Sequence, residues 1–161
     1  MYKLVMLALL AVFQMWMLTV QLEEELAMNL LFELKHGVNR AAHAASIQVD
    51  DNLLAQGIWA IDEQRAAEAG RHVLRENLRL DENWEPVAGS PLKQPVELLT
   101  FEVINSDNSF PYHYVNDDYQ YEVTLYRPGV VFIIRAEYPR LFNVVQPIVW
   151  TVKGTSELYR I

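Results

Sequence analysis

The sequence contains four histidines, which are candidates for metal binding and acid–base chemistry because imidazole binds metals and transfers protons near neutral pH. They are His36, His43, His72 and His113. His36 and His43 are two helical turns apart, so they share a helix face, but about 10 Å separates them, too far to hold one metal ion. We therefore expect solvated or hydrogen-bonded histidines and no metal site.

Two groups of carboxylates are the next candidates for chemistry. Glu23–Glu25 are consecutive, and neighbouring helical residues point about 100° apart, so we expect a solvated collar and not an acid–base pair. Asp107, Asp117 and Asp118 lie in "NSDNSFPYHYVNDDY", whose oxygens could ligate calcium. The spacing lacks the Gly and the terminal Glu of an EF-hand, so a solvated loop is the favoured interpretation and calcium the alternative.

The chain has no recognisable catalytic or cofactor motif. Cysteine is absent, which excludes disulfides and thiolate chemistry. No G-x-S-x-G, G-x-G-x-x-G, P-loop or H-E-x-x-H occurs. A net charge of −8 with scattered Lys and Arg argues against nucleic-acid binding, which needs clustered cations. The sequence thus predicts no enzyme, no cofactor and no nucleic-acid partner.

The most distinctive segment is an apolar run near the start. From Leu4 to Val20 no charged residue occurs. About 17 residues in a helix span roughly 26 Å, just under the ~30 Å hydrocarbon layer of a bilayer. A cleaved signal peptide is disfavoured, because the run is long and is followed by Glu23–Glu25 and not by a small-residue cleavage site. Lys3 before the run and the acids after it favour a cytoplasmic N-terminus.

The helical pattern continues past the acid cluster. Apolar residues recur at spacings of three and four from Leu26 to Val49. One helix is therefore expected from near Met1 to about Asp50, apolar over 4–20 and amphipathic over 21–50. Residues 51–161 would form an outer domain.

Helices come first in that outer domain and strands afterwards. After a break around 50–57, Asp62 is placed to cap a helix over about 62–80, with Gly70 in its middle. From about residue 96 the apolar period changes to two, which predicts strands at 96–104, 119–127, 130–138 and 148–160. Pro128-Gly129 predicts a hairpin between the second and third of these. The fold class is α+β, with an antiparallel sheet of three or four strands covered by the two helices.

The stretch "NLLFELKHGVNRAAHAASIQVD", which follows an apolar helix, resembles the pseudopilins of the Tad (tight adherence) pilus, of the TadE and TadG type. "AAEAGRHVLRENL" resembles their second Ala-rich stretch. The order of elements is similar to type IV pilins more broadly. The resemblance implies a hydrophobic helix that starts in the membrane and later forms the core of a filament.

One feature departs from that family. Its members usually have a short polar leader ending in Gly and a glutamate at the fifth residue of the mature chain. Here the fifth residue is Val5, preceded by Met1-Tyr2-Lys3-Leu4. Two interpretations stay open: this is the processed form, or leader processing does not apply.

The sequence-based prediction is a structural subunit of an extracellular pilus-like filament. Its partners would be copies of itself or other pilin-like subunits, the cytoplasmic membrane before assembly, and the assembly machinery. The alternative is a single-pass membrane protein whose outer domain binds a partner. The residues expected to form the assembly helix are Leu4, Leu7, Leu10, Phe13, Trp16, Val20, Leu26, Leu30, Leu34, Val38, Ala41 and Ala45.

Overall fold

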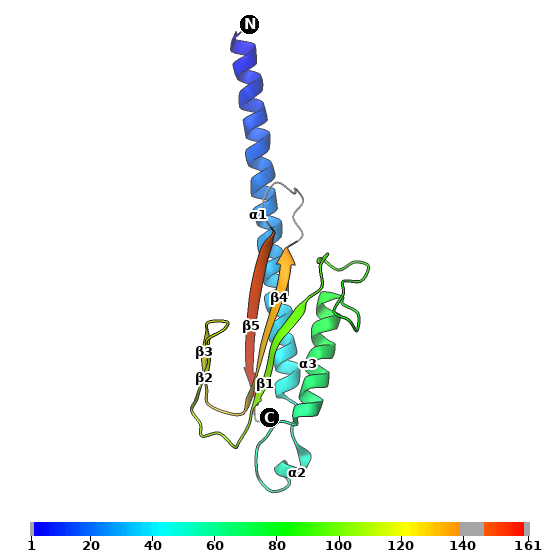
Figure 1. The fold of residues 1–161 in the computed structure, drawn as a ribbon, viewed down its shortest axis with the longest axis vertical. Helices are drawn as coiled ribbons and strands as arrows, with labels where there is room; N and C mark the ends of the chain where they lie inside the picture. The colour runs from blue at the N-terminus through cyan, green and yellow to red at the C-terminus, as the bar shows by residue number, and fades with distance from the viewer. Residues whose placement is uncertain (1, 139–146, 160–161) are drawn as a thin grey trace.

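The computed structural model describes residues 2–138 and 147–159. One helix, α1 (Tyr2–Ser46), dominates its shape (Figure 1). Its N-terminal half extends away from the domain, and its C-terminal half lies beside the sheet and α3. The expected long helix is confirmed, and it ends four residues before Asp50.

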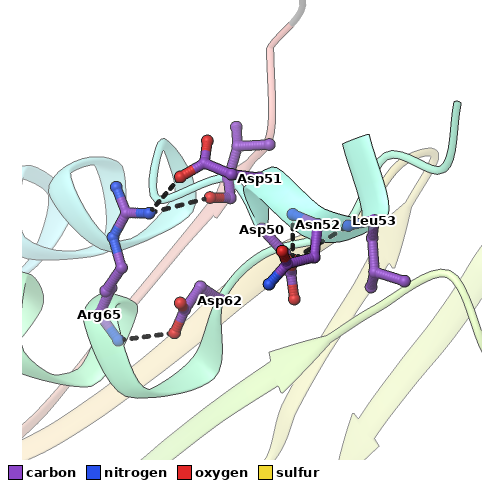
Figure 2. A network of polar contacts seen from close by, with 7 residues as sticks. Asp50, Asp51, Asn52, Leu53, Asp62 and Arg65 are labelled. Carbon is purple, nitrogen blue, oxygen red and sulfur yellow. Dashed lines mark hydrogen bonds and ion pairs between the residues drawn. The ribbon is translucent and has the colours of Figure 1, made fainter. Parts of the chain in front are cut away.

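In the part of the chain that the structure describes, two further helices follow α1. The short helix α2 (Asp51–Leu54) lies in the segment that the sequence marked as a break, and α3 (Glu63–Leu78) agrees with the helix expected at 62–80. Each is capped by an aspartate. Asp50 accepts hydrogen bonds from the amides of Asn52 and Leu53, and Asp62 accepts one from that of Arg65 (Figure 2).

The turn between α1 and α3 is held by the same polar network. The Arg65 guanidinium lies 3.0 Å from the Asp51 carboxylate and also donates to the Val49 carbonyl (Figure 2). At the end of α1, the hydroxyls of Ser46 and Ser156 share a hydrogen bond of 2.9 Å. The C-terminal end of α1 is thereby fixed to both α3 and the sheet.

Within residues 2–138 and 147–159, five strands form two antiparallel sheets, which confirms the α+β class. The strands are β1 (Glu97–Ile104), β2 (Tyr112–Asn116), β3 (Tyr121–Leu125), β4 (Gly129–Tyr138) and β5 (Ile148–Glu157). The main sheet has the order β1-β4-β5, and β2 pairs with β3 in a separate hairpin.

The main sheet is covered on both faces. Alternate residues of β4, including Phe132 and Ile134, pack against α1 and α3 in the larger core. The intervening residues Val131 and Ile133 pack against the β2–β3 hairpin through Tyr114 and Leu125. This is why β4 is apolar on both faces, whereas a strand with one solvated face would alternate.

The hairpin predicted at Pro128-Gly129 is wrong. β3 pairs with β2, with Asn116 opposite Tyr121, and the main sheet pairs β4 with β1 and β5. Residues 112–116, interpreted as part of a loop, therefore form a strand. Gly129 is required by close packing and not by a turn, because a Cβ there would lie 2.9 Å from the Ser156 carbonyl oxygen.

Candidate functional site

The apolar half of α1 is not covered by the other residues that the structure describes. In the 18-residue window that best fits a membrane span, no residue is buried within the molecule. Its large side chains, among them Leu10, Phe13 and Trp16, are all exposed. A contiguous apolar surface of this size marks a site of contact with lipid or with protein.

The residues predicted for the assembly helix divide into two sets. Those from Leu4 to Val20, together with Leu26, are exposed. The other five lie in the core of the domain, against α3 and the sheet, and Leu34, Val38, Ala41 and Ala45 have no exposed surface. These five residues therefore build the core of the domain, whereas the first set presents large apolar side chains to the exterior. The five buried residues of the predicted assembly helix are Leu30, Leu34, Val38, Ala41 and Ala45.

The acidic collar, Glu23–Glu25, lies where α1 enters the domain. Glu24 and Glu25 are exposed, while Glu23 is partly covered and its carbonyl accepts a hydrogen bond of 3.2 Å from the Tyr138 hydroxyl. One flank of α1 here borders a hollow of about 470 Å³, lined by Val20, Glu24 and Met28 with Ile148 and Trp150 of β5. The collar thus borders an apolar recess.

The opposite flank of α1 borders a second, longer depression, here called the lateral groove. It consists of two adjoining hollows of about 310 and 370 Å³, both lined by Glu33 and Pro91. Leu26, Leu30 and Tyr138 line the hollow nearer the N-terminus, whose lining also includes Lys93. The other hollow is lined by His36, Arg40, Asn77 and Arg79.

Two arginines of the lateral groove are oriented by hydrogen bonds. Arg40 donates to the Asn77 side chain at 2.8 Å, and Arg79 donates to the Gly89 carbonyl at 2.9 Å. Arg79 also ends α3 in the left-handed conformation, with φ of 53°. Sequence reasoning missed this groove, because Arg79 and Pro91 are brought to α1 only by the tertiary fold.

A pair of lysines faces one another where α1 meets β5. The Lys35 ammonium donates to the Lys153 carbonyl. Partial burial lowers the pKa of Lys35, and repulsion from the Lys153 charge lowers it further. The Lys153 ammonium donates to the Gln120 carbonyl at 3.1 Å and lies 5.8 Å from the centre of the Tyr121 ring.

The start of β4, the end of β5 and the connection between α2 and α3 meet at the end of the domain farthest from the N-terminus (Figure 1), and residues from these segments form a third surface. A hollow of about 320 Å³ is lined by Trp59, Arg127, Pro128 and Leu158. The Arg127 guanidinium lies 5.9 Å from the centre of the Tyr159 ring. This distal pocket combines apolar, aromatic and cationic groups.

The candidate chemical groups are dispersed. Within residues 2–138 and 147–159, no three His, Asp or Glu side chains gather closely enough to hold a metal ion. Asp107 precedes β2 and accepts a hydrogen bond from the Asn108 amide group, whereas Asp117 and Asp118 lie in the turn between β2 and β3. His36 lines the lateral groove, and His113 lies on the exposed side of the hairpin, 4.0 Å from Glu122.

No protein-family model, curated protein or solved structure matches the chain. The structure itself therefore gives the class of protein: an α+β domain attached to a helix that is long and apolar enough to cross a membrane. A signal sequence near the N-terminus would meet the same criteria of length and composition.

Proposed function

We propose that this chain is a membrane-anchored structural subunit that assembles into a pilus-like filament, with the apolar halves of α1 packed together as the filament core. The observation that carries the proposal is the continuity of α1. At one end the helix is apolar, and none of its residues there is buried by the described part of the chain; at the other end it packs in the core of a folded domain.

The anchor is the simpler part of this proposal. About 20 apolar residues in a helix satisfy their own backbone groups and can cross a bilayer. Lys3 before the span and Glu23–Glu25 after it favour a cytoplasmic N-terminus and an external domain. The chain would occupy the cytoplasmic membrane first and the cell surface after assembly.

Assembly accounts for features that an anchor does not require. The helix carries bulky side chains such as Phe13 and Trp16, which can interlock with neighbouring helices. The C-terminal half of α1 is also part of the core of its domain. A force applied to the external domain would therefore pull the apolar half of α1 out of the membrane. Lipid and protein are both apolar environments, so helix association would depend on close packing and on work done by an assembly machine.

Shearing of cells separates a surface filament from a membrane protein. We expect the wild-type chain in the sheared fraction, and Leu10→Asp in none of it, since a carboxylate in the helix centre costs about 3 kcal/mol in an apolar layer. Leu10→Ile is the matched control and should behave as wild type. Recovery of Leu10→Asp in sheared filaments would contradict the assignment of the core.

A second candidate function is a single-pass protein whose domain binds a partner, and the distal pocket favours it. That pocket, lined by Trp59 and Arg127, lies at the opposite end of the molecule from the anchor. Under this alternative the chain stays in the membrane fraction and is extracted by detergent as a monomer. Arg127→Ala would then reduce partner capture while leaving the amount of anchored protein unchanged.

A further inference from the structure

The lateral groove changes in character along α1. Its hollow nearer the N-terminus is bordered by Leu26, Leu30 and Tyr138, and its other hollow by His36, Arg40 and Arg79. The lining residues include three cations, Arg40, Arg79 and Lys93, and a single carboxylate, that of Glu33. On a chain of net charge −8, this groove is therefore a cationic exception.

One stripe of α1 also changes from apolar to charged along the helix, but its charge is negative. Phe13, Met17, Val20 and Glu24 follow spacings of four, three and four, so they lie on one face of the helix. The stripe is apolar and then acidic in the direction in which the groove is apolar and then basic. All four side chains are exposed.

The stripe and the groove lie on opposite flanks of α1. Val20 and Glu24 border the hollow beside β5, whereas Glu33 and Arg40 border the groove beside the segment that follows α3. A copy that offers its stripe to the groove of a second copy keeps its own groove available for a third. Such a contact is heterologous, and it produces an open chain of subunits when it does not close into a ring.

We infer that the lateral groove binds α1 of a second copy of this chain, in parallel and displaced along the helix axis. Placing Glu24 beside His36 and Arg40 puts Phe13 and Met17 at the level of Leu26 and Leu30. The displacement is about 13 residues, or about 20 Å. This inference rests on the proposed function, because it describes the contact between subunits.

Cysteine cross-linking tests the contact directly, since the chain has no cysteine of its own. The double variant Glu24→Cys/His36→Cys, oxidised in intact cells, should give a ladder of disulfide-linked multimers. Within one chain these positions are about 18 Å apart along the helix, beyond the reach of a disulfide. Each single variant should give no ladder. Glu24→Cys/His43→Cys, displaced by about 10 Å more, is the register control and should cross-link at least about tenfold less.

Charge exchange tests the same contact without cysteine. Arg40→Glu should lower the yield of sheared filaments about tenfold or more, because it places two carboxylates opposite one another. Adding Glu24→Lys should restore the yield. Arg71→Glu, at an exposed position of α3 outside the groove, is the matched control and should leave the yield unchanged.

The outcomes separate this inference from the function on which it rests. Filaments with a ladder from Glu24→Cys/His36→Cys support both. Filaments without that ladder, or with a yield indifferent to Arg40→Glu, overturn the docking inference and leave the filament function standing. A ladder in membranes that yield no filaments supports the docking and refutes the filament. Neither ladder nor filaments refutes both.

Discussion

Gly70 provides the most exacting test of the packing between α1, α3 and the sheet. It lies in the middle of α3, where glycine usually costs a helix about 1 kcal/mol relative to alanine. A Cβ at this position would lie 2.5 Å from Cζ of Phe132 and 3.2 Å from Cβ of Ala45. The Phe132 ring is fully buried and packs edge-on against Phe101 at 4.8 Å, so a shift of this ring would disturb the packing of the core.

We therefore expect Gly70→Ala to destabilise the domain although it improves helix propensity. Overpacking of a core costs about 1 to 3 kcal/mol, and the gain in propensity offsets up to about 1 kcal/mol. Subtracting the full gain in propensity leaves a net loss of up to about 2 kcal/mol. The loss is measured by urea denaturation of the full chain in mild detergent with circular dichroism.

A double-mutant cycle isolates the contact with Phe132. Phe132→Leu removes the ring atoms that approach Gly70, so Gly70→Ala should cost far less in that background. Ala67→Gly, at a half-buried position of the same helix, gives an upper bound on the propensity difference between alanine and glycine in α3. Gly70→Ala with stability equal to or above that of wild type would refute the close packing of α3 on the sheet.

Three further predictions concern the stability of the domain. Asn105 bonds both the amide and the carbonyl of Ile61, at 2.7 and 2.8 Å, so Asn105→Ala should cost about 1 to 3 kcal/mol in urea denaturation; a cost equal to that of the exposed Asn83→Ala would contradict this. The lowered pKa of Lys35 means that the folded state binds this proton less tightly than the unfolded state, so unfolding free energy should rise with pH between that pKa and 10.5, and Lys35→Met should remove the slope. Desolvation raises the pKa of Tyr114, so stability should fall as pH rises from 10.0 through the raised pKa, and a fall of the same size in Tyr114→Phe would show that another group is responsible.

The sequence was sufficient for the two long helices, α1 and α3, and for the class of the fold. α1 and α3 follow from local patterns: an uninterrupted period near 3.6 and an aspartate at Asp62 that caps the next helix. The sheet pairing was predicted less well, because pairing depends on packing that local patterns do not record. Gly129 resembles a turn residue in sequence, but its position is explained by contact with β5.

The candidate site was predictable only in part. The exposed apolar residues from Leu4 to Val20 follow from hydropathy alone. Leu34 and Ala45 belong to the same helical stripe, and only the fold shows that their own domain covers them. The lateral groove could not be foreseen, since Arg40, Arg79 and Pro91 come from three separate segments.

The central claim is that the apolar half of α1 is covered by other copies of this chain. Electron cryo-microscopy of material sheared from cells that express the chain tests it most directly, with the recovered protein identified by sequencing. The proposed function predicts filaments of this chain with a core of α1 helices and the α+β domains on the outside. Sheared material without such filaments, and a chain recovered only as a detergent-extracted monomer, would contradict the claim and favour the anchored binding protein.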